Sequence, residues 1–191
     1  MGLLDAAGQP IAGTDRVLVL DSASQSWTFD GLTAAPVPSL LRGFSAPVIL
    51  EWDASEADLF TLLGHDTDAF NRWEAGQRLA VQRLLTAVRA GGELVLDAGY
   101  LSAMRTLLND GALDAAFKEL VLTLPSEGYL AERMAEAGEP IDPQKIHAAR
   151  ESMRAQLARG LHADWVAAWE QNSQTGGYRP DPVSCGRRAL A

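Results

Sequence analysis

Two patterns of hydrophobic and polar residues divide the chain near Asp53. Before that residue, the segments are short, punctuated by Gly and Pro, and rich in β-branched or alternating apolar residues, as in RVLVLD at residues 16–21 and SWTF at residues 26–29. A period of two is typical of half-buried strands, and the Gly, Pro, Asp and Ser residues between the runs are typical of turns. The first 53 residues therefore predict a hairpin or meander of about four strands.

After residue 53, the apolar residues recur at helical spacing, which predicts amphipathic helices. Residues that favour a helix start mark several boundaries. Ser55 followed by Asp58 resembles a capping box, and Asp142 and Asp181 each precede a proline at the first helical position. We expect six to seven helices, over residues 56–64, 68–90, 97–109, 112–122, 127–136, 143–172 and 181–191.

The spacing also predicts which helical residues are buried. The expected stripe of the second helix comprises Phe70, Trp73, Val81, Leu84, Leu85 and Val88, and that of the sixth comprises Ile146, Met153, Leu157, Leu161, Trp165 and Trp169. Gly160 is expected to bend or break the sixth helix. The fold class is α+β, with a small β-part over residues 1–53 and a solenoid-like α-helical array over residues 54–191.

Charge and cysteine content narrow the classes of function. The 191 residues carry a formal net charge of −9, which disfavours nucleic acid and anionic membranes as partners. No apolar run approaches the roughly 20 residues needed to span a bilayer, and no export signal is visible. Cys185 is the only cysteine, so an intrachain disulfide is excluded. We expect no membrane or nucleic-acid partner, and a cytoplasmic location.

His65, Asp66 and Asp68 form the densest cluster of potential metal ligands. A metal site needs three or four converging groups, whereas this cluster lies where one expected helix ends and the next begins. Helix capping by Asp66 or Asp68 is the preferred interpretation. His147 and His162 are too far apart along one expected helix to bind one ion, so we expect packing or surface roles. We predict no catalytic residue and no metal ligand.

Other reactive patterns also have plainer interpretations. Ser45 has no nucleophile-elbow context, and Gly91 and Gly92 lack the following lysine of a phosphate loop, so they predict a helix C-terminus. For Cys185, a buried structural thiol is preferred to a reactive thiolate near two arginines. The helical spacing of Trp73, Trp165 and Trp169 is typical of core packing.

Five long blocks follow one another along the chain: APVPSLLRGFSAPVILE (35–51), DAFNRWEAGQRL (68–79), LTLPSEGYLAE (122–132), IDPQKIHAAR (141–150) and GYRPDPVSCGRRAL (177–190). In this order they resemble bacterial alanyl aminopeptidase N, a family of zinc metallo-aminopeptidases. The resemblance implies the end of an immunoglobulin-like β-domain, a partial β-sandwich over residues 1–53. The start of the family's C-terminal α-helical domain would follow over residues 54–191.

The catalytic domain of that family holds zinc through an H-E-x-x-H helix and grips the substrate amine with a G-x-M-E-N loop. Neither motif occurs in this sequence. The resemblance therefore implies a non-catalytic segment of a larger hydrolase, with zinc in the full-length parent and none in this segment. The implied partners are the catalytic and N-terminal domains of the same polypeptide and the parent's peptide substrates.

In the family, the helical domain encloses the active-site chamber and restricts it to peptides and unfolded ends. Arg187 and Arg188 lie in the last block, and such side chains facing the chamber would bind a peptide's C-terminal carboxylate. The solvated start of a helix is the alternative interpretation of these arginines.

A second interpretation of the whole chain is a freestanding helical-array interaction module with a small β-cap. Unpaired strand edges and an uncovered apolar helix stripe also predict self-association of this chain in isolation.

Overall fold

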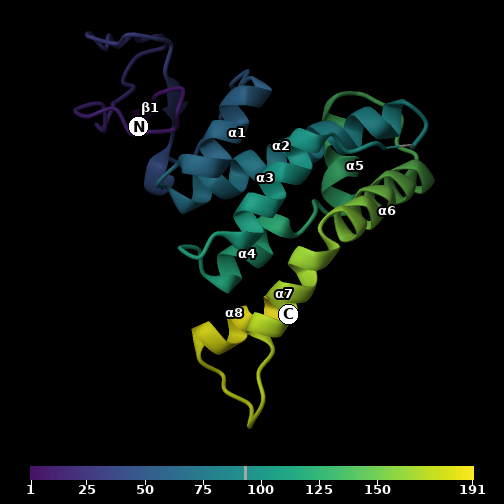
Figure 1. The fold of residues 1–191 in the computed structure, drawn as a ribbon. Helices are drawn as coiled ribbons and strands as arrows, with labels where there is room; N and C mark the ends of the chain where they lie inside the picture. Colours follow the sequence, from purple (N-terminus) through teal and green to yellow (C-terminus); the bar gives the residue numbers. More distant parts are fainter. Residues whose placement is uncertain (93) are drawn as a thin grey trace. The chain divides into compact units, whose positions relative to one another are not determined.

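The computed structural model describes residues 1–92 and 94–191 (Figure 1). Its elements in chain order are β1 (Gly2–Leu4), β2 (Val37–Ser39), a short 3-10 helix η1 (Arg42–Phe44), α1 (Glu56–His65), α2 (Ala69–Arg89), α3 (Ala98–Asn109), α4 (Ala115–Leu122), α5 (Glu127–Glu136), α6 (Pro143–Gly160), α7 (His162–Asn172) and α8 (Pro182–Leu190). The chain forms two compact units, Met1–Gly76 and Gln77–Ala191. No helix in the described ranges is long and apolar enough to cross a membrane.

The first unit contains a two-stranded antiparallel sheet in which residues 2–4 of β1 pair with residues 39–37 of β2. Pro38, which has no backbone donor, lies opposite Leu3. The amide of Leu3 donates to the hydroxyl of Thr14 at 3.1 Å. The proline therefore occupies a strand position that needs no donor, as expected for proline in a sheet.

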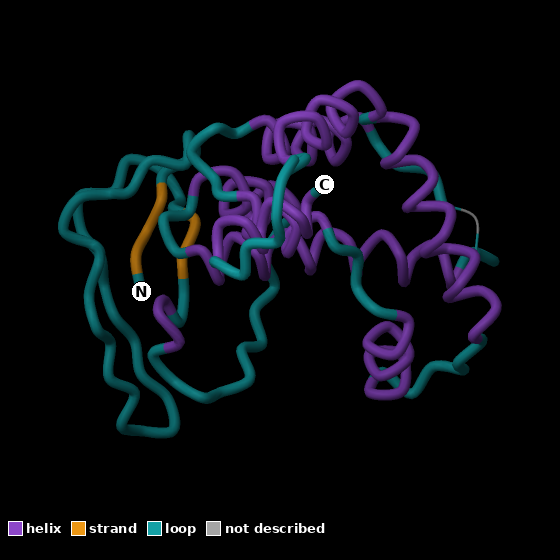
Figure 2. Tube along the Cα trace, turned by 90° about the horizontal axis from the view of Figure 1, so that it is seen from below, coloured by secondary structure: helices purple, strands orange, loops and turns teal. Residues whose placement is uncertain are grey.

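The predicted number of about four strands is corrected by the structure, which has two strands among its described residues. The predicted strand segments at residues 16–21 and 26–29 belong instead to the long irregular loop between β1 and β2, drawn in teal in Figure 2. Val17 and Val19 are 86% and 65% exposed. A segment of this composition is stable as a strand only beside a partner strand and a core. Arg16 exchanges backbone hydrogen bonds with Met1, but the exposed Val17 and Val19 contribute to no core.

The helix starts follow the capping signals of the sequence. At α1, the hydroxyl of Ser55 accepts the amide of Asp58 at 3.1 Å, and the Asp58 carboxylate accepts the amide of Ser55 at 3.0 Å. Asp142 caps α6 and Asp181 caps α8 in the same way. These predicted caps are confirmed, because each side chain satisfies an amide that the helix itself leaves unbonded.

The core of the second unit is built from one face of each helix. The predicted stripes are confirmed for Leu84 and Val88 of α2 and for Ile146, Met153 and Leu157 of α6, all of which are buried. Helix α5 packs against α6, and α7 contacts α3, α6 and α8. Stacked amphipathic helices thus produce the array that the helical periodicity predicts.

Helices α4 and α8 meet at Gly186 of α8. A Cβ atom at this position would lie 2.8 Å from the Cβ of Ala116 and 2.9 Å from its backbone nitrogen. Real side chains do not approach so closely, so the absence of a side chain at Gly186 sets the distance between the two helices.

The single helix predicted over residues 143–172 is divided at Leu161 into α6 and α7. Leu161 has φ −116° and ψ 21°, and its side chain is buried. Two carbonyl groups near the break accept side-chain donors: Arg105 donates to Gly160 at 2.8 Å, and the Trp165 indole donates to Leu157 at 3.3 Å. The break expected at Gly160 is confirmed one residue further on, which gives eight α-helices in the described ranges.

Candidate functional site

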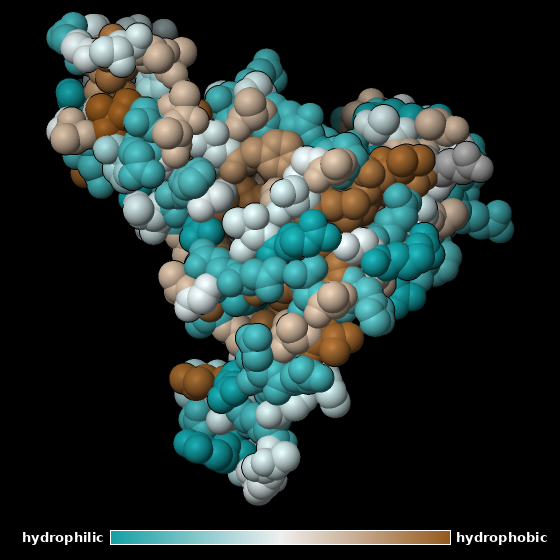
Figure 3. Space-filling view, in the orientation of Figure 1, coloured by the Kyte–Doolittle hydropathy of each residue, from teal (hydrophilic) through white to brown (hydrophobic). Residues whose placement is uncertain are grey.

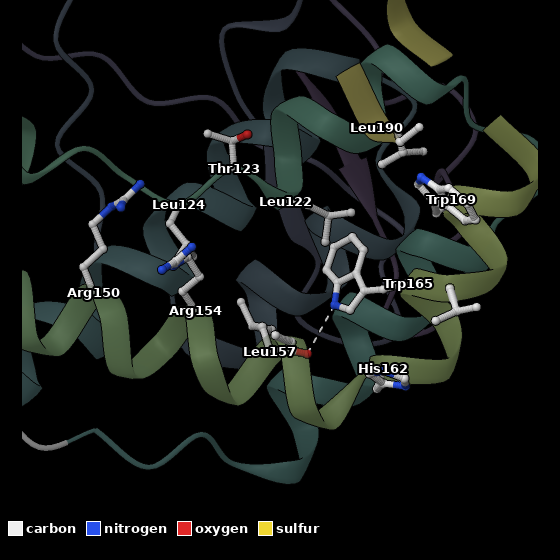
Figure 4. A pocket seen from close by; sticks show the side chains of 13 residues that line it. Leu122, Thr123, Leu124, Arg150, Arg154, Leu157, His162, Trp165, Trp169 and Leu190 are labelled. Carbon is white, nitrogen blue, oxygen red and sulfur yellow. Dashed lines mark hydrogen bonds between the residues drawn. The ribbon is translucent and has the colours of Figure 1, made fainter. Parts of the chain in front are cut away.

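An apolar groove of about 650 Å³ lies in the second unit (Figure 4). Helices α4, α6, α7 and α8 and the residues after α4 supply its walls. Its lining comprises Leu122, Thr123, Leu124, Arg150, Arg154, Leu157, Ala158, His162, Trp165, Val166, Trp169, Leu190 and Ala191. Concave apolar surfaces with a few polar groups are the usual setting of binding sites.

Two tryptophans of α7 dominate this groove. Trp165 and Trp169 are separated by one helical turn, so both project from the same side of α7. The Trp165 indole is fixed by its hydrogen bond to the Leu157 carbonyl, the dashed line in Figure 4. Trp169 is 56% exposed, which corrects its assignment to the core. Helical spacing identifies the apolar side of α7 but not whether another helix covers it.

The exposed apolar surface extends beyond the groove. In the second unit, Tyr178 and Val183 lie outside the lining of the groove and are 77% and 71% exposed. On the face drawn in Figure 3, hydrophobic side chains gather in patches separated by hydrophilic ones. Single exposed apolar residues need no explanation, but a concave surface lined by two indoles indicates an interaction surface.

Arg150 and Arg154 of α6 place positive charge at the groove. Arg154 donates two hydrogen bonds to the Glu151 carboxylate, and Arg150 Nη1 lies 3.8 Å from the same carboxylate. The hydrogen bond from Arg154 is the largest cause that lowers the pKa of Glu151, and the charges of Arg154, His147 and Arg150 add to it. Two guanidinium groups share one carboxylate, so this edge of the groove is net positive.

The predicted substrate-binding residues Arg187 and Arg188 lie on α8, outside the lining of the groove. Arg187 donates to the carbonyl of Gln171, and Arg188 donates to the carbonyl of Arg179 at 2.9 Å. The Arg188 guanidinium also lies 4.7 Å from the centre of the Tyr178 ring. Arg187 therefore binds the last turn of α7, and Arg188 binds the segment between α7 and α8. The contact of either arginine with a peptide stays a prediction.

Cys185 is exposed, which corrects the expectation of a buried thiol. It lies in the first half of α8, and its sulfur accepts a hydrogen bond from Arg188 at 3.1 Å. The buried positions of this helix are Ser184 and Gly186, so Cys185 falls between them on the side facing solvent.

In the first unit, the side chains of His65, Asp66 and Asp68 each contact other residues of the same chain. Asp66 is 2% exposed, and its Oδ1 accepts Nη1 of Arg42 at 3.0 Å and the amide of Asp68 at 2.9 Å. Asp68 accepts the amide of Asn71 at 3.0 Å in the first turn of α2. The preferred capping interpretation is confirmed for Asp68, whereas Asp66 is a buried ion-pair partner.

Arg42 is the centre of this arrangement, and sequence reasoning missed it. Besides Asp66, its guanidinium donates to Ser39 Oγ at 3.1 Å and to Thr67 Oγ1 at 2.6 Å. Asn71 donates to the same Ser39 hydroxyl at 2.9 Å. We call these five side chains the Arg42 network. Arg42 and Asp66 are 24 residues apart in sequence, so no local pattern reveals their pairing.

The three histidines play separate roles. His65 packs against Gly8, where a Cβ atom would lie 2.2 Å from the imidazole Cγ and where φ is 78°. His147 lies 2.8 Å from Glu127, and His162 lines the groove. In the described residues no three His, Cys, Asp or Glu side chains are placed to hold a metal ion. The described residues therefore do not fit a zinc site.

Comparison with known domain families shows which family each part of the chain matches. Residues 56–191 match a family described as a domain of unknown function (DUF3458_C) with ARM repeats, and residues 1–53 match one described as a domain of unknown function (DUF3458) with an Ig-like fold. The class is thus an Ig-like segment followed by an ARM-type helical array. This confirms the α+β fold class, although the division into domains at residues 53 and 54 stays a prediction.

The whole chain is similar to part of several aminopeptidases. Aminopeptidase N of Caulobacter vibrioides is 43% identical over 191 residues, which are 100% of this chain and 21% of that protein. Aminopeptidase N of Escherichia coli is 34% identical over 190 residues, 98% of this chain and 21% of that protein. The crystal structure of Legionella pneumophila aminopeptidase A in complex with aspartic acid has a TM-score of 0.82 at 29% identity, covering 99% of this chain and 22% of that one.

The chain belongs to the DUF3458_C domain family over residues 56–191, and the resemblance to aminopeptidase N that its five sequence blocks predicted is confirmed. The chain spans about a fifth of the length of the relatives it matches.

Proposed function

We propose that this chain is a non-catalytic segment of a zinc aminopeptidase N that removes N-terminal amino acids from peptides in the cytoplasm. In this proposal, the segment supports the other domains of the same polypeptide and forms part of the wall of the active-site chamber. The similarity of the entire chain to about a fifth of each aminopeptidase N carries the proposal. Zinc and the groups that bind the substrate amine belong to other parts of that enzyme.

The absence of an H-E-x-x-H motif supports a structural role for this segment, because the sequence provides no helix with paired histidine ligands. The groove lined by indoles and the exposed valines of residues 16–21 also support it. Such surfaces are costly to leave in water, and neighbouring domains of one polypeptide are their natural cover.

The first test compares this chain with the longer enzyme. We expect the 191-residue chain to cleave no alanine p-nitroanilide and to bind no stoichiometric zinc, whereas the longer protein does both. Peptidase activity from this chain alone would refute the proposal. Sedimentation velocity on the same sample tests the predicted self-association, and a monomer at high concentration would contradict that part.

The second test addresses the wall of the chamber. If Arg187 and Arg188 bind a peptide carboxylate, the variants Arg187→Ala and Arg188→Ala in the longer enzyme raise KM for tripeptides and leave KM for alanine p-nitroanilide unchanged. The matched control is Arg133→Ala, whose guanidinium pairs with Glu136 on the surface of α5. A loss of thermal stability with no change in either KM would assign both arginines to their observed backbone contacts alone.

The alternative function is a freestanding helical-array interaction module with a small β-cap. The gene sequence upstream of the Met1 codon distinguishes the two. An in-frame H-E-x-x-H motif there excludes the free module, and a stop codon followed by a promoter excludes the enzyme segment.

A further inference from the structure

We propose that residues 39–44 and residues 66–71 form a latch, which holds the Ig-like segment on α1 and the start of α2 and has a second, released state. In the released state the Ig-like segment separates from helices that stay folded. Both sides of the latch lie in the unit Met1–Gly76. They fall in different family matches, because residues 1–53 match the Ig-like family and residues 56–191 match the ARM-repeat family. The latch does not depend on the proposed function.

The contact between the two sides of the latch is polar and buried. From the Ig-like side, Arg42 donates to Asp66 at 3.0 Å and to Thr67 at 2.6 Å. From the helical side, Asn71 donates to the Ser39 hydroxyl at 2.9 Å. Three of the five buried polar side chains in the described ranges lie here, namely Ser39, Asp66 and Asn71. Polar contacts between the parts of a chain permit relative motion more readily than large apolar contacts do.

The loop on the Ig-like side of the latch has a strained backbone. Leu41 and Phe44 have φ values of 51° and 54°, in the left-handed region that bulky residues avoid. The helical side holds this loop, because the Gly43 amide donates to Asp68 at 2.8 Å and the Phe44 ring lies 4.1 Å from the Phe70 ring, centre to centre. Strain of this kind persists only where surrounding contacts impose it. The loop therefore relaxes when the two sides separate, which favours the released state.

The connection between the two parts permits the separation. Residues 45–55 contain no helix or strand, and Ile49 within them is 94% exposed. Strand β2 contacts α1, and its Val37 is buried, so release exposes apolar surface to water. The latched state is therefore the major one and the released state the minor one, as in other two-state elements.

Hydrogen exchange of the 191-residue chain, measured on its peptides by mass spectrometry, tests the latch. Arg42→Met should accelerate exchange in β1 and β2 by at least about tenfold and leave exchange in α1 unchanged, because the Ig-like segment separates before the helix unfolds. Ser39→Ala removes an acceptor that Arg42 and Asn71 share, so it should act in the same direction with a smaller effect, and it decides the test if Arg42→Met does not fold. The matched control is Arg133→Met, which removes a surface ion pair and should change neither rate.

A pair of leucine substitutions tests the strain. Leu40 and Leu41 are neighbours and both are half-buried, but of the two only Leu41 has a positive φ. Leu41→Gly removes strain as well as a side chain, so its acceleration of exchange in the two strands should be about tenfold smaller than that of Leu40→Gly. In the Arg42→Met background, where the loop has relaxed, this difference should disappear.

Three results overturn the inference. Equal acceleration in the strands and in α1 would show that the network stabilises one cooperative unit, which has no latch. Unchanged exchange in the strands of both Arg42→Met and Ser39→Ala would show that the network does not hold the Ig-like segment. Equal effects of Leu40→Gly and Leu41→Gly in the unmodified chain would show that strain does not favour release.

Discussion

Replacing Arg42 with methionine tests whether the Arg42 network is a major source of stability in the first unit. The substitution keeps much of the apolar stem and removes donors to Ser39, Asp66 and Thr67. In the unmodified chain Asp66 is 2% exposed, and no partner for its Oδ2 is found among the described residues. Without Arg42, the amide of Asp68 remains as the partner of its Oδ1. The variant therefore leaves the buried carboxylate of Asp66 without its ion-pair partner.

The magnitude follows from the burial of the two partners. Removing one partner of a buried ion pair costs about 3–5 kcal/mol. The side chain of Asp66 is 0% exposed, but that of Arg42 is 23% exposed, so water reaches part of the site. We therefore expect Arg42→Met to lower the free energy of unfolding by about 3 kcal/mol, at the lower end of that range.

Urea unfolding followed by far-UV circular dichroism measures this loss. Hydrogen exchange on peptides covering residues 37–44 and 59–71 then shows whether the loss is confined to the network. The control variant Arg133→Met removes an ion pair whose side chains are 50% and 64% exposed, for which about 0–1 kcal/mol is expected.

The double variant Arg42→Met with Asp66→Asn isolates the buried charge. It should be less destabilised than the sum of the two single variants, because a neutral amide needs no guanidinium partner. If Arg42→Met costs no more than the surface control, the reasoning that assigns stability to this network is refuted.

Three further predictions concern packing and titration. Gly186→Ala should lower the free energy of unfolding by about 1–3 kcal/mol, because α4 and α8 must move apart to admit a methyl group. The control Gly64→Ala has open space around it and should be neutral or stabilising by up to about 1 kcal/mol. Equal effects of the two substitutions in urea unfolding would contradict this prediction. Gly8→Ala should cost about 2 kcal/mol, because φ is 78° and the imidazole blocks a methyl group; an unchanged melting temperature would contradict this. The pKa of Asp164 is lowered by a hydrogen bond from Asn109, the largest cause, and by one from Arg105. This carboxylate therefore stabilises the fold at pH values above its unfolded pKa of about 4, and the contribution is lost as the pH falls through its folded pKa. Asn109→Ala should raise the pKa of Asp164 in an NMR titration and reduce the loss of stability in acid; an unmoved pKa would contradict it.

Local chemistry made the helical part of the fold predictable. A cap such as Ser55 with Asp58 depends on residues three positions apart, and an amphipathic stripe depends on spacing within one helix. The sequence therefore placed most helix starts, the break near Gly160 and the buried residues of α6 correctly.

The strands and the site were harder to predict because they depend on distant partners. The run of four apolar residues within 16–21 has the composition of a strand, but a strand needs a neighbouring strand, and none pairs with it in the described residues. The same limit explains Trp169, whose spacing is that of a core residue and whose cover is absent from the described residues. Arg42 was missed because its carboxylate partner lies 24 residues away, beyond any local motif.

The break at Leu161 fixes the rotational phase of α7. Each residue of an α-helix advances the chain by about 100° around the axis and 1.5 Å along it. Inserting a single residue between Leu161 and Trp165 would therefore turn both indoles about a quarter of a circle away from the groove, without changing any side chain. Many substitutions on α7 should be tolerated in this family, but insertions and deletions just after the break should be rare, because the length of this segment determines which way α7 faces.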